Sequence, residues 1–202
     1  VVISPDATFY GGTTDTRIGY SLGTAAIAGS TTSGGDAALI GAPFRDGFGG
    51  TYEGAAYYTP GGNITGVQSL SASSVMIIPE GVYPRVGRMV SAGDVTGDGY
   101  SDVLVGIPEH EDGGTTDTGG AFLFYGSRLE DRTAHPLGSA IEYPTAELHL
   151  IGEYANDHAG NGSSIVGDLN LDGEADIAVG ATWNASGGTY AGAVYVILSS
   201  HR

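Results

Sequence analysis

The chain has no cysteine, no lysine and no long hydrophobic run. Without cysteine it has no disulfide framework, no thiolate nucleophile and no thiolate ligand for zinc. Spanning a bilayer takes about 20 consecutive apolar residues, and no run approaches that length, so we expect no membrane insertion. Against 23 acidic residues there are only 7 basic ones, all arginine, which gives a formal net charge of −16. Because such a surface repels phosphate backbones, we expect no nucleic-acid partner.

Glycine is abundant, and its distribution indicates the class of fold. The 36 glycines show no three-residue period and lie between short apolar runs rather than in one block. This pattern excludes collagen and simple disorder. A hydrophobic content of 41% is compatible with a buried core, and no window shows a helical period. Glycine-rich turns between short apolar runs therefore predict an all-β protein.

Three segments of the chain align with one another over most of its length. Each contains an apolar run that ends in an anchoring glycine, and these glycines are Gly41, Gly106 and Gly180. They are separated by 65 and 74 residues (106 − 41 and 180 − 106), which is too long for a solenoid turn but suits a small four-stranded antiparallel sheet. We predict a single domain over 1–202 whose approximate repeats are 1–68, 69–137 and 138–202.

The apolar runs within each repeat predict where strands lie. The runs 103–105 and 177–179 are apolar on both faces, as expected for strands buried between neighbouring sheets. The runs 121–125 and 193–196 each follow a glycine-containing turn signal, which suits the next strand of a hairpin. Clusters of Gly, Ser, Thr and Asp between the runs predict loops.

Two acidic loops, 93–102 and 167–176, carry oxygen-bearing side chains at positions 1, 3, 5 and 9, counted from Asp94 and Asp168. A hard cation such as Ca²⁺ takes 6–8 oxygen ligands, and a glycine at position 6 permits the sharp turn that brings alternate residues inward. Position 7 then offers its backbone carbonyl. The predicted side-chain ligands are Asp94, Thr96, Asp98, Asp102, Asp168, Asn170, Asp172 and Asp176, and the predicted carbonyl ligands belong to Tyr100 and Glu174.

Two other interpretations of these loops are weaker. An EF-hand requires a bidentate glutamate at position 12, where this chain has Val105 or Val179. Each loop also leads directly into an apolar strand rather than into a helix. The carboxylates could instead simply cap Asp-Gly turns, but two such loops in register within a repeat favour a metal site.

With these features the sequence resembles the FG-GAP repeats of the integrin α-subunit propeller and their bacterial relatives. The first element of the repeat appears as Ile18-Gly19, Val86-Gly87 and Ala159-Gly160. The second appears as Gly41-Ala42-Pro43, Gly106-Ile107-Pro108 and Gly180-Ala181-Thr182. The resemblance implies β-propeller blades of four antiparallel strands, Ca²⁺ in the acidic loops and an extracellular or cell-surface location.

The three units depart from the family pattern to different degrees. Thr96 stands where the family has Asp or Asn, so we expect the loop of the third unit, with Asn170, to bind calcium more tightly. The corresponding stretch of the first unit, 28–36, keeps only the carboxylate of Asp36, so we predict no calcium there.

Three units are too few to close a propeller ring, which usually has 4–8 blades. We therefore expect self-association or further propeller blades to cover the outer units, at strands 37–40 and 193–197. The leading interpretation is a non-catalytic, calcium-binding adhesion or assembly module with a protein or glycan ligand. One alternative is the subunit of an extracellular filament built by self-association of incomplete propellers. Another is the non-catalytic propeller part of a secreted hydrolase or carbohydrate-binding protein.

Two short patterns remain. Residues 19–23 match the G-x-S-x-G motif of hydrolases, but they lack the strand-to-helix context that a catalytic Ser21 requires. Asn63 and Asn184 begin N-glycosylation sequons in loops rich in small polar residues, where a glycan is sterically acceptable.

Overall fold

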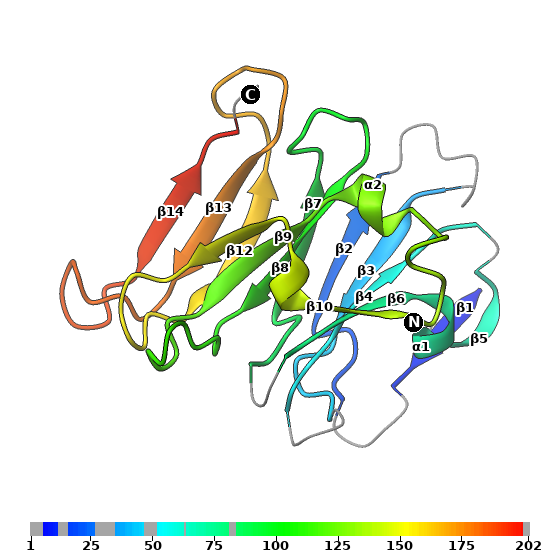
Figure 1. The fold of residues 1–202 in the computed structure, drawn as a ribbon, viewed down its shortest axis with the longest axis horizontal. Coiled ribbons are helices and arrows are strands. Elements are labelled where there is room, and N and C mark those ends of the chain that lie inside the picture. The colour runs from blue at the N-terminus through cyan, green and yellow to red at the C-terminus, as the bar shows by residue number, and fades with distance from the viewer. Residues whose placement is uncertain are drawn as a thin grey trace, which may run out of the picture.

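The computed structural model is built almost wholly of β-strands, which confirms the predicted all-β class (Figure 1). The residues that it describes are 6–11, 16–26, 35–46, 52–62, 64–80 and 84–199. The described helices are single turns, namely α1 (Leu70–Ser73), α2 (Gly126–Leu129) and the 3₁₀ turn η1 (Tyr143–Thr145). None of the described helices is long and apolar enough to cross a membrane.

Three sheets follow one another along the chain, and each repeats the same antiparallel strand order. The first contains β2 (Ser21–Ala25), β3 (Ala37–Gly41), β4 (Ala56–Thr59) and β6 (Val75–Ile78), with β10 (Ala140–Glu142) added in parallel at the outer edge. The second contains β7 (Met89–Gly93), β8 (Asp102–Ile107), β9 (Gly120–Phe124) and β11 (Leu148–Ile151). The third contains β12 (Ala159–Val166), β13 (Asp176–Ala181) and β14 (Ala193–Ile197).

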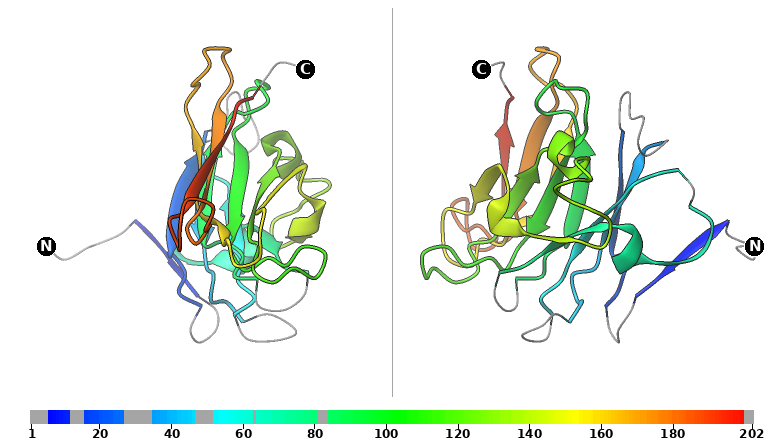
Figure 2. Two further views of the ribbon diagram at one scale, coloured as in Figure 1. Left: turned by 90° about the vertical axis from the view of Figure 1, so that its left-hand side faces the viewer. Right: turned by 45° about the vertical axis from the view of Figure 1, so that its right-hand side comes forward.

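The sheets lie face to face in chain order, as successive blades of a propeller do (Figure 2). The strands nearest the centre, β2, β7 and β12, contact one another in sequence. The first two blades have four antiparallel strands, as predicted. Within the described part of the chain the third blade has three, and no strand lies beyond β14.

The outer strands show how the blades divide the chain. Strand β6 completes the first blade and β11 completes the second, so the blades extend over 21–78, 89–151 and 159–197. The approximate repeat limits at 68 and 137 therefore fall before the outer strands. Those limits follow the glycine motifs, and the outer strands carry no such motif.

Each interface between blades is a continuous apolar layer. Between the first and second blades, Leu39 and Tyr58 pack with Val105 and Phe122, each no more than 1% exposed. Between the second and third, the core residues are Leu104, Leu123, Ile165, Ile177 and Val179. All six residues of β8 are buried because this strand has a blade on both of its faces.

Glycine sets how closely two blades approach. A Cβ atom added to Gly41 would lie 2.2 Å from the carbonyl oxygen of Gly87 in the next blade, and one added to Gly106 would lie 2.2 Å from that of Gly160. Gly87 and Gly160 adopt φ angles of +83° and +84°, which side chains rarely tolerate. The two motifs of the repeat are therefore the two halves of one contact between blades.

The outer face of the first blade is covered, contrary to the prediction that strand 37–40 lacks a neighbour. Ile40 is 6% exposed and Tyr57 is 7% exposed, because they pack with Leu70 of α1 and with Phe9 and Ile18. Phe9 belongs to β1 (Ala7–Tyr10), which pairs in parallel with β5 (Gly66–Ser69). By contrast, strand 193–197 is exposed on one face, as predicted, with Val194 71% and Val196 53% exposed.

The contact between glycines predicts a matched pair of substitutions. Gly106→Ala places a methyl group against the backbone of the third blade, and overpacking of this kind costs about 1–3 kcal/mol. We expect the melting temperature, followed by circular dichroism, to fall by roughly 2–4 °C per kcal/mol. Gly162→Ala is the control, because its added Cβ would meet nothing within 4 Å. Equal melting temperatures for the two variants would contradict this account of the interface.

Candidate metal centre

The two acidic loops lie at the same end of adjacent blades, at the top of Figure 1. The first connects β7 to β8 and the second connects β12 to β13. The N–H of Ala175 in the second loop donates to the carbonyl oxygen of Asp94 in the first, at 2.9 Å. The loops are therefore in direct contact, although more than 70 residues separate them in the sequence (168 − 94).

In the first loop, the position 1 aspartate holds the turn together. Asp94 Oδ1 accepts from the N–H of Asp98 at 3.2 Å, and its Oδ2 accepts from the N–H of Gly99 at 2.9 Å. Asp98 accepts in turn from the N–H of Tyr100 at 2.9 Å. Gly99 has a φ of +86°, so the position 6 glycine adopts the positive φ that the sequence predicts.

The second loop repeats the same bonds at the same positions. Asp168 accepts from the N–H groups of Asp172 at 3.1 Å and Gly173 at 2.8 Å, and Asp172 accepts from the N–H of Glu174 at 2.9 Å. Gly173 has a φ of +98°. Two loops of different sequence thus share one backbone arrangement, which the aspartates at positions 1 and 5 and the glycine at position 6 impose.

The aspartates at position 9 are fully buried and tie each loop to its blade. Asp102 accepts from the N–H of Val95 at 3.0 Å and from that of Gly126, just after β9, at 2.9 Å. Asp176 accepts from the N–H of Leu169 at 2.7 Å and from that of Ser199, just after β14, at 2.8 Å. Each carboxylate therefore joins its loop to the third strand of the blade, a role that the ligand pattern does not predict.

These two aspartates differ in how readily they ionise. Burial raises the pKa of Asp102 to about 6, backbone hydrogen bonds oppose that rise, and the negative charges of Asp98 and Asp94 add to it. Burial also acts to raise the pKa of Asp176, but hydrogen bonds from Leu169 and Ser199 outweigh it and hold the pKa below its usual value. The Ser199 hydroxyl gives Asp176 an additional donor, at 3.0 Å.

Position 3 also differs between the loops. Thr96 Oγ1 is buried and, among the described residues, has no hydrogen-bond partner. Asn170 is fully engaged, because its Nδ2 donates to Asp172 Oδ2 at 2.9 Å and to the Ser199 carbonyl at 3.0 Å. A buried oxygen without a hydrogen-bond partner costs free energy of folding. In the first loop, Thr96 Oγ1 is therefore available to bind a further partner.

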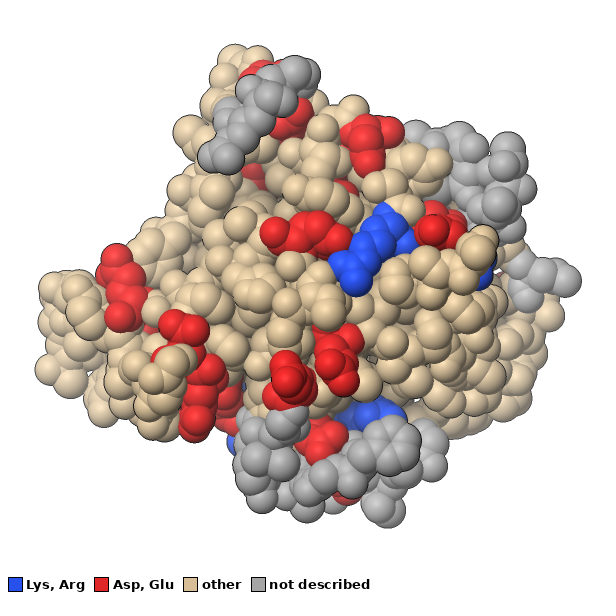
Figure 3. Space-filling model, viewed as in Figure 1, with Lys and Arg blue, Asp and Glu red and all other residues tan. Residues whose placement is uncertain are grey.

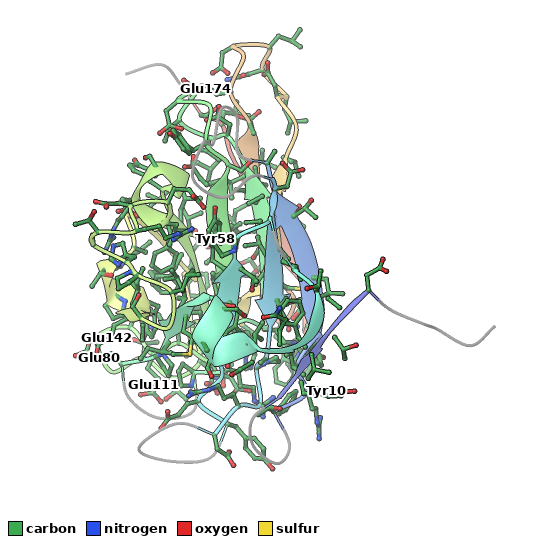
Figure 4. The ribbon with its side chains drawn as sticks, turned by 90° about the vertical axis from the view of Figure 1, so that its right-hand side faces the viewer. Tyr10, Tyr58, Glu80, Glu111, Glu142 and Glu174 are labelled. Carbon is green, nitrogen blue, oxygen red and sulfur yellow. The ribbon has the colours of Figure 1, made fainter. Side chains whose placement is uncertain are left out.

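Glu174 contributes more than the backbone carbonyl that the sequence predicts. Its side chain is 5% exposed and lies against the first loop, since a Cβ added to Gly97 would be 3.2 Å from Glu174 Oε1. Figure 4 shows Glu174 among the loops at this end of the sheets. No sequence signal places this carboxylate beside a loop formed by residues more than 70 positions earlier.

The donor atoms of both loops are oxygens, which is the set that Ca²⁺ prefers. Their geometry is not that of a preformed cage. Among the described residues, no group of three or more His, Cys, Asp or Glu side chains is arranged to hold a metal ion. The carboxylates of Asp94, Asp98, Asp168 and Asp172 instead accept hydrogen bonds from their own loop. The loop of the first unit lies largely outside the described residues.

The remaining predicted features have structural explanations. Ser21 Oγ donates to the Gly87 carbonyl at 3.0 Å, so the serine of the G-x-S-x-G motif links two blades. Asn184 is 1% exposed, and its Nδ2 donates to Asp157 at 2.9 Å and to Tyr195 at 3.3 Å, which leaves no place for a glycan and corrects that prediction. Asn63 lies outside the described residues.

Comparison with known protein families agrees with this geometry. The family profile of the FG-GAP repeat matches residues 86–124 and 160–197, which contain both acidic loops and, except for Ala159, the first three strands of the second and third blades.

Individual relatives come from two groups. Phosphatidylinositol-glycan-specific phospholipase D of Bos taurus is 32% identical over 148 residues, which are 69% of this chain and 16% of that protein. The protein of the same name from Homo sapiens is 35% identical over 138 residues, covering 67% and 15% of the two chains. Integrin alpha-IIb of Homo sapiens is 34% identical over 116 residues, covering 55% and 10%.

The chain thus spans about a sixth or less of the length of these relatives. What it shares with them is the repeat itself, with its acidic loop and its apolar strands. From the two matched repeats, the blade architecture and the integrin α relatives, we conclude that this chain belongs to the FG-GAP repeat family, of the integrin α-like type.

Proposed function

We propose that this chain is a calcium-stabilised, non-catalytic binding module of an extracellular or cell-surface protein. The observation that carries the proposal is the pair of acidic loops, which fold alike, touch one another and contain the unpaired buried oxygen of Thr96. Acidic side chains also spread over the face shown in Figure 3, with few arginines among them. A module with a net charge of −16 is stabilised when cations neutralise its carboxylates.

Specific residues would hold the ions. In the first loop these are the side chains of Asp94, Thr96 and Asp98, the carbonyl of Tyr100 and the buried carboxylate of Asp102. In the second they are the corresponding atoms of Asp168, Asn170, Asp172, Glu174 and Asp176. A bound cation removes the repulsion from Asp94 and Asp98 that helps to raise the pKa of Asp102. A site therefore forms when the carboxylates exchange backbone N–H donors for the ion.

The absence of catalysis is part of the proposal. Ser21 belongs to the one hydrolase motif in the sequence, and its hydroxyl is used in a contact between blades. The matched relatives include a phospholipase, but the shared segment is only 16% of the bovine enzyme. This overlap also supports a second candidate function, in which the chain is the non-catalytic part of a secreted hydrolase or of a carbohydrate-binding protein.

The surface opposite the acidic loops favours a carbohydrate as one ligand. A groove of about 640 Å³ is lined by Tyr154, Asp157, Trp183 and Tyr190, among others. Trp183 is 51% exposed and packs edge to face against His158 and Tyr190. Exposed aromatic rings beside polar groups present the mixed apolar and hydrogen-bonding surface that a sugar ring requires.

Calcium should stabilise the folded module through both loops. Extracellular calcium modules bind with dissociation constants of about 10⁻⁴ to 10⁻³ M. Calcium at ten times that constant stabilises each site by about 1.4 kcal/mol, which raises the melting temperature by roughly 3–6 °C. We expect Asp172→Ala to remove the larger part of this increase and Asp36→Ala, outside both loops, to leave it unchanged. A melting curve that calcium does not move would refute the calcium proposal.

The raised pKa of Asp102 predicts a pH dependence in calcium-free protein. Between the unfolded pKa of about 3.9 and the folded pKa of about 6, the folded state binds the proton more tightly. Protonation therefore stabilises the fold fully at about pH 4, and this contribution is lost as the pH rises through 6. We expect the free energy of urea unfolding for Asp102→Asn, measured from pH 4.5 to 7 in EDTA, to lack this decrease. Parallel profiles for the two proteins would contradict it.

The carbohydrate interpretation has its own test. In a glycan-binding screen, Trp183→Ala should lose at least tenfold in affinity for any glycan that the parent chain binds, because stacking on the indole ring is lost. Tyr10→Ala is the matched control, since Tyr10 is an exposed aromatic residue (64%) remote from the groove. Binding that survives Trp183→Ala would mean that the glycan site lies outside this groove. If the parent chain binds no glycan, the carbohydrate-binding function is excluded.

A further inference from the structure

The layer that covers the outer face of the first blade contains a cavity of about 260 Å³, on the side that faces the viewer in Figure 4. One wall is the blade itself, at Ala42 and Tyr57. The other is the cover, at Ser69 of β5 and at Leu70 and Ser71 of α1. Sites for drug-sized molecules are clefts of about 300–1,000 Å³. This cavity therefore has the size for a ligand smaller than those.

The groups that line the cavity are suited to an anion that also carries hydroxyl groups. Thr16, Tyr57, Ser69 and Ser71 each bring a hydroxyl. Arg45 brings a guanidinium, and none of the described residues that line the cavity is acidic. A guanidinium presents five N–H donors in a planar fork that matches the geometry of a carboxylate. The lining thus offers one positive charge together with several neutral hydrogen-bonding groups.

The charge of Arg45 is not used in a salt bridge. Arg85, Arg128 and Arg132 pair with glutamates at 2.8–3.0 Å. Within the described part of the chain Arg45 forms no such pair, although acidic residues outnumber basic ones by 23 to 7. The guanidinium in the cavity is therefore available to an anionic ligand.

The surrounding structure holds Arg45 in place. Its N–H donates to the carbonyl of Ala42 at 3.0 Å, and its own carbonyl accepts from the N–H of Gly54 at 2.9 Å. Its side chain lies beside the hydroxyl of Tyr57, which is 7% exposed. Burial raises the pKa of Tyr57, and the positive charge of Arg45 opposes that rise. Two donors, one charged and one neutral, are thus fixed side by side before a ligand arrives, which lowers the entropy cost of binding.

A second arginine lies close to the cavity but outside it. Arg17 stands in the chain between Thr16 and Ile18, which both line the cavity. Its own side chain is exposed and lies over the ring of Phe44, with the guanidinium carbon 4.1 Å from the ring centroid. A nearby exposed charge attracts an anion without contacting it. Arg17 is therefore a natural control for Arg45.

We propose that this cavity binds a small hydroxylated carboxylate. The carboxylate pairs with the guanidinium of Arg45 and accepts from the hydroxyl of Tyr57. The hydroxyl groups of the ligand bond with Ser69 and Ser71, and its carbon chain lies against Leu70. A single guanidinium balances a single negative charge, so a monoanion fits better than a doubly charged phosphate in a chain whose net charge is −16.

Two probes of matched shape test the class of ligand. Gluconate has a carboxylate where sorbitol, with the same six-carbon hydroxylated chain, has an alcohol. Loss of a hydrogen bond to a charged group lowers affinity by about 10- to 100-fold. In calorimetric titrations with EDTA, which keeps calcium from the acidic loops, we expect gluconate to bind about tenfold or more tightly than sorbitol. Hexanoate, a carboxylate without hydroxyl groups, should bind several-fold more weakly than gluconate. Inorganic sulfate that binds as tightly as gluconate would contradict the proposed class.

Matched variants test the role of Arg45. Arg45→Gln should reduce the affinity for gluconate to that for sorbitol, because the charge that distinguishes the two probes is gone. Arg17→Gln removes the same charge outside the cavity, and salt screens its effect. We expect Arg17→Gln to change the affinity by no more than about twofold in 0.15 M salt. Equal losses in the two variants would show a general effect of charge and would contradict a site at Arg45.

A second pair of variants tests the cavity without changing charge. Ser71 and Ala72 are neighbouring exposed residues of α1, and of the two only Ser71 lines the cavity. Ser71→Trp should fill the space and abolish gluconate binding, whereas Ala72→Trp should leave it intact. Both side chains are exposed, so the circular dichroism spectra should be unchanged and separate loss of binding from unfolding.

Three results would overturn the proposal. The first is a parent chain that does not bind gluconate. The second is gluconate binding that Arg45→Gln and Ser71→Trp both leave intact. The third is binding that Trp183→Ala removes and Arg45→Gln does not, which would place gluconate in the groove of the third blade. The calcium and carbohydrate proposals depend on none of these results, because their tests use other residues and other ligands.

Discussion

The contact between two glycines, one at the end of a blade's second strand and one at the start of the next blade, fixes the geometry of this molecule. At Gly41 and Gly106 a backbone carbonyl occupies the space where any other residue has its Cβ atom. This approach sets the distance between sheets at which Leu39 and Tyr58 meet Val105 and Phe122 without a gap. A core of large side chains thus depends on positions that have none.

The same contact determines the arrangement of the acidic loops. Because successive blades are held at one distance, the loop after β7 and the loop after β12 lie side by side and share a hydrogen bond between Ala175 and Asp94. Glu174 then lies beside Gly97 of the neighbouring loop. The loops therefore form an acidic surface that belongs to the pair of blades.

At the interior end of each loop lies a buried carboxylate whose hydrogen-bonding capacity is used. Asp102 and Asp176 are fully buried, yet both oxygens of each accept backbone hydrogen bonds from the loop and from the residue after the third strand. Their different pKa values arise from the number of donors and from the nearby charges of Asp94 and Asp98. Repeats with one backbone arrangement therefore differ in electrostatics through a few side chains.

The sequence by itself determined the all-β class, the number of repeats, the positions of the buried strands and the turns of the acidic loops. These features depend on local patterns, namely apolar runs such as 103–105 and glycines such as Gly99 whose positive φ the turn requires. Only the tertiary structure decided which strands complete each blade, what covers Ile40 and Tyr57, and that Asn184 is buried. It also decided the tethering role of Asp102 and Asp176 and the place of Glu174. Each of these depends on contacts between segments distant in the chain, and no local pattern of residues encodes which distant segment packs against which.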